Sequence, residues 1–228
     1  MRERTGEFPV EIAGGDTDRG INLQKRVARV ERSVGPLRGK RVLDCGCGAG
    51  GYAHAYAARG ARVIGIEYQR EKLRRARRDV PGVLLIAADA TALPIASESV
   101  DVAILNEVLE HVPDQTRELR EVRRVLVRAG KLVLMSPNRL FPFEAHGVTL
   151  RFGARRLPAH TPFVPWVPLP LGSRVFDYWA RNYWPWELRR LVREAGFEIT
   201  ETGFLAQTLE NLSGTQPGWL GTLKPTLR

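Results

Sequence analysis

The feature that most constrains the fold is a glycine-rich turn between an apolar run and an alanine-rich segment. The apolar run spans residues 41–45, the turn at 46–51 contains four glycines, and alanines are frequent from there to Arg59. Glycine allows backbone conformations with positive φ and lets a ligand approach where a β-carbon would block it. A helix that begins at such a turn offers its free amides to the ligand. The pattern therefore predicts a strand, a nucleotide-binding turn and a helix.

The same kind of unit recurs along the chain. Further apolar runs suit strands, and they alternate with amphipathic segments that suit helices. The expected strands are 61–66, 83–87, 100–105 and 131–135, and the expected helices are 20–34, 70–79 and 114–127, with Asp18 and Asp114 as caps of the first and last helix. Alternation of strands and helices predicts right-handed parallel crossovers and a doubly wound α/β sheet.

The alternation stops after the fifth strand. Residues 137–183 concentrate proline and aromatic side chains, and so long a loop in a compact domain is usually a lid or a binding loop. We interpret it as a substrate cap, whose arginines (Arg139, Arg151, Arg155 and Arg156) suit an acceptor with an anionic group. The alternative is a packed insertion in which the aromatics form a satellite core and no ligand binds. A helix over 185–195 and a strand over 197–204 are expected to follow.

Composition narrows the class of protein further. A length of 228 residues favours one domain, with an N-terminal helical segment (1–37), a cofactor-binding core (38–136), the cap (137–183) and a C-terminal part (184–228). No apolar run reaches the ~20 residues of a membrane span, and the two cysteines, Cys45 and Cys47, are too close in a tight turn to bridge. We therefore expect a cytoplasmic protein with no membrane span. The net charge of +10 favours anionic partners, but its basic residues are spread over helix faces, which makes nucleic acid the second choice.

The glycine turn alone leaves two cofactors open. Gly46, Gly48 and Gly51 satisfy the G-x-G-x-x-G fingerprint of dinucleotide-binding proteins, and Glu67 lies where those proteins place a ribose-binding acid. A nicotinamide-dependent oxidoreductase is therefore one interpretation of this turn. The motif is weak when taken by itself.

Four segments in order favour another cofactor. They are V-L-D-C-G-C-G-A-G at 42–50, Glu67 after the second strand, A-D-A-T at 88–91 and N-E-V-L-E-H-V at 106–112. Together they resemble the class I S-adenosylmethionine-dependent methyltransferases, in particular the methyltransferase-11-like branch with the ubiquinone-type O-methyltransferases. The resemblance is close over 38–137 and looser over 184–204. It implies a seven-stranded, mostly parallel, Rossmann-like sheet with the cap after its fifth strand.

The resemblance also implies roles for the residues that bind the cofactor. Asp44 would face the cationic amino-acid end of S-adenosylmethionine, and Asn106 would lie near its amino group. Glu67 would accept hydrogen bonds from the ribose hydroxyls, while Asp89 and the backbone at Ala90 would contact the adenine edge. The glycines that give the cofactor clearance are Gly46, Gly48 and Gly50.

The E-x-x-E-H arrangement after the fourth strand concerns the methyl acceptor. A similar trio binds a divalent cation in the ubiquinone-type enzymes and in RNA 3′-terminal 2′-O-methyltransferases, and the RNA enzymes add a downstream histidine. The resemblance thus implies that Glu107, Glu110, His111 and His146 hold Mg²⁺ or a related ion. The same motif also occurs without a metal, so that the glutamate and histidine merely support the loop, or His111 or His146 acts as a metal-free general base.

We accordingly expect an S-adenosylmethionine-dependent O-methyltransferase of a small-molecule acceptor: a hydroxylated metabolite, quinone precursor, lipid or sugar. The rival enzyme is a metal-dependent RNA 2′-O-methyltransferase, which the basic charge favours, although no separate RNA-binding module is recognisable. The remaining alternatives are the oxidoreductase and a catalytically silent subunit that binds the cofactor.

Overall fold

The computed structural model describes residues 21–144, 146–153, 155–157 and 161–205. The expected cap Asp18 lies outside these ranges. The helices are α1 (Ile21–Val34), α2 (Gly51–Ala57), α3 (Arg70–Asp79), α4 (Gln115–Val125), α5 (Leu169–Val175) and α6 (Pro185–Glu194). The strands are β1 (Arg41–Cys45), β2 (Arg62–Glu67), β3 (Leu84–Ala87), β4 (Val100–Asn106), β5 (Leu126–Met135), β6 (Val148–Leu150) and β7 (Phe176–Tyr178). None of the helices in these ranges combines the length and the apolar character that a bilayer crossing requires.

The first five strands form one parallel sheet in the order β3-β2-β1-β4-β5. The chain starts in the middle at β1, moves outward through β2 to β3, and then returns to the other side of β1 through β4 to β5. This reversal places the carboxyl ends of β1 and β4 side by side, and ligands of doubly wound sheets bind where the strand order reverses. The predicted α/β class and parallel crossovers are confirmed.

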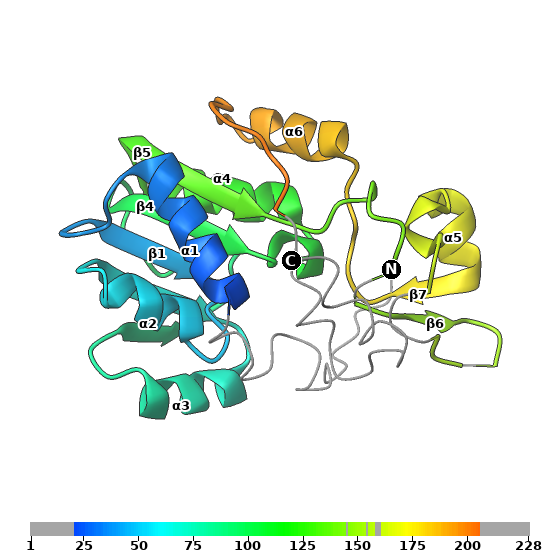
Figure 1. Cartoon of the computed structure of the whole chain (residues 1–228), viewed down its shortest axis with the longest axis horizontal. Helices are drawn as coiled ribbons and strands as arrows, with labels where there is room; N and C mark the ends of the chain where they lie inside the picture. Colours follow the sequence, from blue (N-terminus) through cyan, green and yellow to red (C-terminus); the bar gives the residue numbers. More distant parts are fainter. Residues whose placement is uncertain (1–20, 145, 154, 158–160, 206–228) are drawn as a thin grey trace.

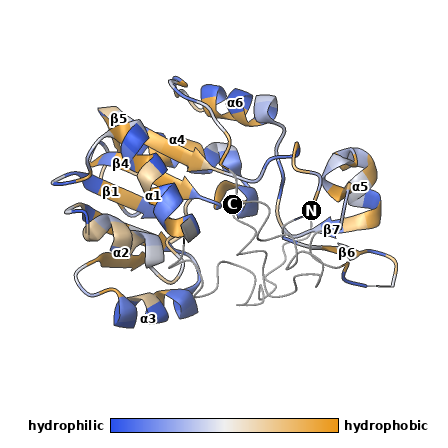
Figure 2. Ribbon diagram, in the orientation of Figure 1, coloured by the Kyte–Doolittle hydropathy of each residue, from blue (hydrophilic) through white to orange (hydrophobic). Residues whose placement is uncertain are grey.

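Helices cover both faces of the sheet (Figure 1). One core contains apolar side chains of α1, α2 and α3 against the sheet, and the other contains those of α4 and α6. The strands at the centre are mostly apolar, whereas α3 presents mostly hydrophilic residues to the outside (Figure 2). The amphipathic pattern selects the buried face of each helix, and the helices lie close to their expected ranges, except that α4 ends at Val125 and β5 already begins at Leu126. Asp114 caps α4 as expected, since its side chain accepts a hydrogen bond of 2.9 Å from the Arg117 amide.

The cap forms a smaller lobe beside the sheet (Figure 1). It contains the antiparallel pair β6-β7 and the short helix α5. Two extended segments connect it to the core, and they pair with each other through hydrogen bonds from the Arg139 amide to the Tyr183 carbonyl (2.8 Å) and from the Tyr183 amide to the Pro137 carbonyl (3.3 Å). We call these paired segments, 136–139 and 181–184, the stem. The stem fixes one side of the cap against the carboxyl edge of the sheet.

One predicted strand is wrong. Residues 197–204 were expected to form a strand, but they adopt no regular secondary structure. The segment is held by side chains, because Glu201 accepts from Ser33 (2.9 Å) and forms an ion pair with Arg29 (2.7 Å), both on α1. Alternating apolar residues form a strand only where a sheet edge supplies backbone partners. Within the described residues, the expected seven-stranded sheet is therefore a five-stranded parallel sheet with a separate two-stranded pair.

Candidate functional site

The glycine turn lies at the carboxyl end of β1. Gly46, Gly48 and Gly50 all have positive φ, at 75°, 56° and 85°. A β-carbon at Gly46 would lie 2.4 Å from a methyl carbon of Val108, whereas a β-carbon at Gly48 would meet no atom within 4 Å. Gly46 thus allows close packing inside the protein, and Gly48 borders open space. Of the glycines expected to give a cofactor clearance, Gly48 borders open space, whereas Gly46 is needed for packing against Val108.

Asp44 is buried under this turn, with only 2% of its surface exposed. Its Oδ2 atom has no hydrogen-bond partner among the described residues. Burial, followed by the charge of Glu67, raises the pKa of Asp44 to about 7, and a hydrogen bond from the backbone of Ala53 offsets part of this effect. A buried carboxyl group at this edge, with one oxygen that lacks a partner among the described residues, is suited to receive a cationic ligand group.

Glu67 is the last residue of β2, the neighbour of β1, and Asp89 follows the end of β3, the next strand of the sheet, by two residues. Glu67 is 7% exposed and accepts hydrogen bonds from the amides of Gly48 (3.0 Å) and Gln69 (2.7 Å), so it also holds the glycine turn in place. Asp89 is exposed and accepts from the Thr91 amide and hydroxyl, at 2.8 and 2.9 Å. Ala90 is half-buried beside it. The three successive strand ends therefore carry their acids at one edge of the sheet.

Asn106 and Glu107, at the end of β4, share a partner that the sequence did not predict. Arg26 of α1 donates to Asn106 Oδ1 (2.6 Å) and to Glu107 Oε1 (2.5 Å), and it is itself 8% exposed. Burial acts to raise the pKa of Glu107, but the charge and the hydrogen bond of the Arg26 guanidinium act against it. The pKa of Glu107 therefore lies below its ordinary value. Glu107 also has a positive φ of 56°, which is strained for a glutamate. Its charge is directed to Arg26.

Glu110, His111 and His146 form a second group. Each offers one ligand atom, and these atoms all lie within 4.8 Å of one another. The two imidazole rings meet edge to face with centroids 5.1 Å apart. Glu110 Oε1 and His146 Nδ1 are buried without a hydrogen-bond partner among the described residues, while Ser136 donates to Glu110 Oε2 at 3.2 Å. The structure thus brings together three of the four residues expected to hold a metal, with Glu107 facing Arg26 instead.

The environment makes this group electrically neutral near pH 7. Burial raises the pKa of Glu110 to about 8, and the charge of Glu107 adds to that shift. Desolvation and then His146 lower the pKa of His111 to about 4, against a hydrogen bond to the Trp179 backbone that favours the charged ring. Burial also lowers the pKa of His146. Two neutral imidazoles beside a protonated carboxyl group can accept a proton or bind a cation.

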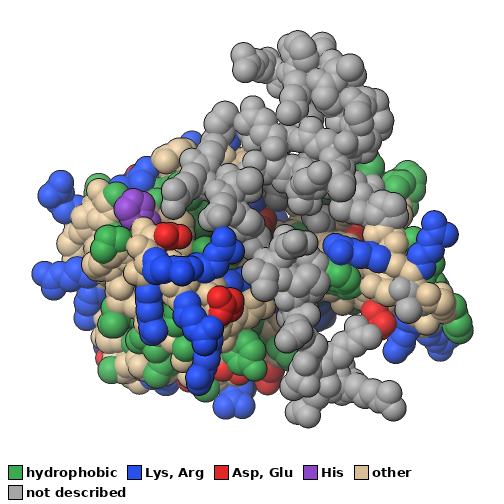
Figure 3. All heavy atoms as spheres, turned by 90° about the horizontal axis from the view of Figure 1, so that it is seen from below, with side chains coloured by type: hydrophobic (Ala, Val, Ile, Leu, Met, Phe, Trp, Pro, Cys, Tyr) green, Lys and Arg blue, Asp and Glu red, His purple; other side chains and the backbone are tan. Residues whose placement is uncertain are grey.

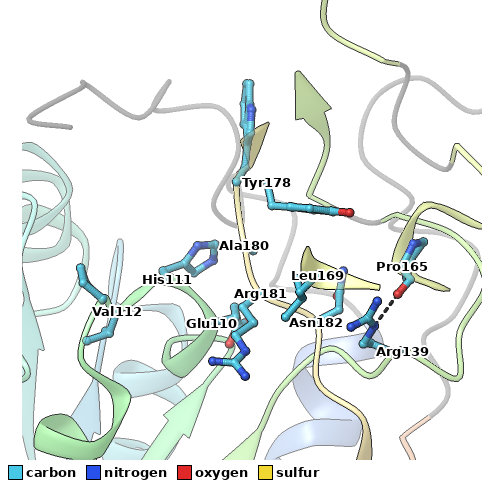
Figure 4. Close-up of a pocket in the computed structure, with 12 residues that line it drawn as sticks. Glu110, His111, Val112, Arg139, Pro165, Leu169, Tyr178, Ala180, Arg181 and Asn182 are labelled. Atoms are coloured by element: carbon cyan, nitrogen blue, oxygen red, sulfur yellow. Dashed lines mark hydrogen bonds between the residues drawn. The ribbon is translucent and has the colours of Figure 1, made fainter. Parts of the chain in front are cut away.

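A cavity of about 320 Å³ adjoins this group, between the carboxyl edge of the sheet and the cap. Glu110 and His111 line its core side, and Tyr178, Arg181 and Asn182 line its cap side (Figure 4). The predicted cap therefore forms one wall of a cavity next to the expected chemistry.

The sequence analysis missed Arg26, and it also missed Glu118, which is fully buried in α4. Both had a visible signal. Arg26 occupies the apolar stripe of α1, three residues after Leu23 and four before Val30. Glu118 shares its helix face with Val122 and Val125. A charged residue within an apolar stripe is the pattern that marks such positions.

Comparison with known proteins agrees with the geometry. Residues 43–134 match a family described as "Methyltransferase domain". An uncharacterized methyltransferase of Mycobacteroides abscessus is 38% identical over 53% of this chain and 49% of its own length, and a demethylmenaquinone methyltransferase of Renibacterium salmoninarum is 35% identical over 56% and 54%. A crystal structure of an S-adenosylmethionine-dependent methyltransferase from Mesorhizobium loti superposes with a TM-score of 0.58 at 22% identity, covering 78% of this chain and 84% of that one. The chain spans about half the length of the curated relatives it matches.

Fold, glycine turn and strand-end acids define a Rossmann-like domain of the kind that binds S-adenosylmethionine. With the family match, residues 43–134 are a methyltransferase domain of the class I S-adenosylmethionine-dependent type, a class of enzymes that uses this cofactor as methyl donor. Its relatives include a quinone-branch enzyme, the demethylmenaquinone methyltransferase. This membership replaces the nicotinamide-dependent interpretation of the glycine turn.

Proposed function

We propose that the protein transfers the methyl group of S-adenosylmethionine to an oxygen atom of a small hydroxylated acceptor. The observation that carries this proposal is the Glu110, His111 and His146 group at the wall of the cavity under the cap. In this proposal the chain acts as one domain, with 38–136 holding the cofactor and 137–183 covering the acceptor.

The cofactor would lie over the glycine turn, between the ends of β2 and β4. Asp44 would bind its amino-acid ammonium group, Asn106 would lie beside that group, and Glu67 would receive the ribose hydroxyls. Asp89 and Ala90 would bound the adenine. Arg26 adds a cation on the Asn106 side, where it can neutralise the carboxylate of the methionine moiety. These placements explain why Asp44 is buried without a full set of partners.

An oxygen acceptor follows from the chemistry of the His111 group. A hydroxyl is a weak nucleophile until it loses its proton to a base or a metal lowers its pKa. One nitrogen of the neutral His111 ring interacts with the backbone of Trp179, which leaves the other nitrogen as an acceptor. In the reaction the acceptor oxygen forms a bond to the methyl carbon, the carbon–sulfur bond breaks, and the hydroxyl proton passes to the ring and then to solvent.

The same residues fit a divalent cation. The three ligand atoms converge, and two of them are buried and without a hydrogen-bond partner in the described part of the chain. Two imidazoles and one carboxylate are a ligand set that divalent transition metals bind. Glu110, His111 and His146 would hold the ion, and it would supply acidification of the acceptor hydroxyl. Glu107, being paired with Arg26, would support the set from outside rather than bind the ion.

Two experiments distinguish a general base from a bound divalent cation as the group that activates the acceptor hydroxyl. Mass spectrometry of a cell extract incubated with the protein and labelled methyl donor identifies the acceptor, and turnover is then measured with EDTA and with added Mg²⁺, Mn²⁺ or Zn²⁺. Loss of turnover in EDTA and its recovery with one ion supports the metal. Unchanged turnover in EDTA contradicts the metal and leaves the base.

Variants test the assignment of the group itself. We expect His111→Asn and His146→Asn to lower kcat by ~100-fold or more if the histidines act in proton removal or metal binding. His54→Asn, at an exposed histidine of α2, is the matched control and should leave kcat unchanged. Full activity in both site variants would show that this group does not activate the acceptor.

One observation favours RNA as a second candidate acceptor. Five arginines of α3 are exposed (Arg70, Arg74, Arg75, Arg77 and Arg78), and Lys and Arg side chains gather on that side of the sheet-containing half (Figure 3). Contacts with phosphates would make binding fall steeply with salt. RNA affinity measured between 50 and 200 mM salt tests this candidate, and affinity that is absent or independent of salt rejects it.

A further inference from the structure

Two arginines line the cavity under the cap, and they differ in how they are engaged. Arg139 is 5% exposed, donates from Nε to the Pro165 carbonyl and from Nη2 to the Val167 carbonyl (2.5 Å), and lies 5.2 Å from the Trp184 ring centroid (Figure 4). Its hydrogen bonds hold the cap to the stem. Arg139 is therefore committed to structure.

Arg181 is held only weakly. Its Nη1 lies 3.5 Å from Gln115 Oε1 and its Nη2 lies 3.7 Å from Glu187 Oε1, whereas charge-assisted hydrogen bonds measure ~2.7–2.9 Å. Its Nε is buried and has no hydrogen-bond partner within the described ranges. The remaining contact is with the Tyr183 ring, 5.0 Å from the guanidinium carbon. The buried Nε without a partner is costly, and the side chain as a whole is 39% exposed, so this guanidinium is free to turn toward a ligand.

The other cap arginines are not available to the cavity. Arg151 donates to the Ser173 carbonyl at 2.6 Å, and Arg156 stacks on Trp179 with its guanidinium carbon 4.3 Å from the ring centroid. Neither lines the cavity. The anion-binding role expected for the cap arginines thus falls to Arg181, which the sequence analysis did not single out.

The rest of the wall is mainly apolar. Val112, Pro113, Pro165, Leu169, Trp179 and Ala180 contribute to it. An anion that enters such a cavity gives up water and needs a cation in return. A volume of about 320 Å³ is at the small end of ligand pockets and suits one ring with small substituents.

We propose that Arg181 selects the methyl acceptor, and that this acceptor is a hydroxylated aromatic carboxylate whose carboxylate meets Arg181 and whose hydroxyl meets His111. This inference rests on the proposed function, because it takes the cavity to be the acceptor site. The ring lies against the apolar wall between the two groups. Arg181 is then the residue that separates anionic from neutral acceptors.

The experiment measures binding of a matched pair of probes by calorimetry, with and without S-adenosylhomocysteine, the demethylated product of the donor. The probes are 3,4-dihydroxybenzoate and its neutral amide, 3,4-dihydroxybenzamide. We expect the wild-type protein to bind the benzoate at least tenfold more tightly than the amide. Arg181→Gln should remove this preference by weakening the benzoate and leaving the amide within about threefold, and Arg181→Lys should keep part of it.

The control is Arg174→Gln, which removes the same charge from an exposed position of the cap helix α5 that does not line the cavity. It should keep the preference. Equal binding of the two probes by the wild-type protein, absence of benzoate binding, or an unchanged preference in Arg181→Gln overturns the proposal. Failure to bind S-adenosylhomocysteine instead counts against the proposed function, and the benzoate preference of the protein alone remains measurable in that case.

Discussion

Asp44 is the residue whose protonation state should control how tightly the carboxyl edge of the sheet binds a cationic ligand. It lies one residue before the end of β1 and is 2% exposed, so that water does not compensate its charge. Because burial raises its pKa to about 7, the group is about half protonated at neutral pH in the free protein. A cationic ligand favours the ionised form, so binding and deprotonation are coupled.

We therefore predict that affinity for S-adenosylhomocysteine falls as pH decreases from 8 to 6. The affinity should approach a tenfold loss per pH unit below the pKa of about 7 and level off above it. Calorimetry across this range checks the slope. In Asp44→Asn the affinity should be weak and independent of pH between 6 and 8. A flat profile in the wild-type protein would show that Asp44 does not contact the cation.

At the scale of elements, the glycine turn meets two requirements: Gly46 allows packing against Val108, and Gly48 leaves open space for a ligand. An alanine substitution at each position tests one requirement. We predict that Gly46→Ala lowers the free energy of unfolding by ~2–4 kcal/mol, since it adds a clash with Val108 to a backbone at φ 75°. Gly48→Ala should cost only ~1 kcal/mol, because its β-carbon meets nothing. Its affinity for S-adenosylhomocysteine should nevertheless fall by at least tenfold.

Denaturant unfolding and calorimetry on the two variants give the four values needed. Gly153→Ala, with φ 81° and no atom within 4 Å, is the control for left-handed strain away from the turn. If Gly48→Ala binds the cofactor product as tightly as the wild-type protein, the space above Gly48 is not the cofactor site.

The elements that periodicity predicts well are those that bury one face against the sheet. The bounds of α3 match the expected range, and β2, β3 and β4 agree within a residue at either end. The segment 197–204 fails because alternation of apolar residues does not say whether a sheet edge is available as a partner. The site divides in the same way. Its strand-end residues follow from topology. The place of Arg26 in the apolar stripe of α1 indicates that it is buried, but its partners Asn106 and Glu107, like the contacts of Arg181 in the stem, depend on tertiary structure that no local pattern contains.

For the whole molecule, the titratable groups with shifted pKa values make stability depend on pH in two opposite ways. His111 and His146 have lowered pKa values, so the unfolded chain binds more protons than the folded one up to about pH 6.5, and stability rises with pH there. Asp44, Glu110 and Glu118 have raised pKa values, so the folded protein retains protons that the unfolded chain releases. Their contribution to stability is lost as pH rises toward about 8. The first effect fades above pH 6.5, as the unfolded histidines lose their protons, so the second effect dominates toward pH 8.

The effect of the raised carboxyl pKa values on stability can be measured at Glu118 alone, because this carboxyl group is fully buried in α4 and has no hydrogen-bond partner among the described residues. Burial, with a smaller effect of Asp89, raises its pKa from 4.5 to about 8. We predict that the free energy of unfolding of the wild-type protein decreases between pH 6.5 and 8, and that Glu118→Gln removes about 1–2 kcal/mol of this decrease. Denaturant unfolding at several pH values measures how the free energy of unfolding changes with pH in both proteins, with Glu194→Gln, at an exposed carboxyl group of α6, as the control.

Equal slopes of the free energy of unfolding against pH in the wild-type protein and Glu118→Gln would mean that Glu118 ionises in the folded core. In that case an unpaired charge would lie in α4 near Asp89, at the proposed cofactor edge, and the affinity for the cationic donor should drop when that charge is removed.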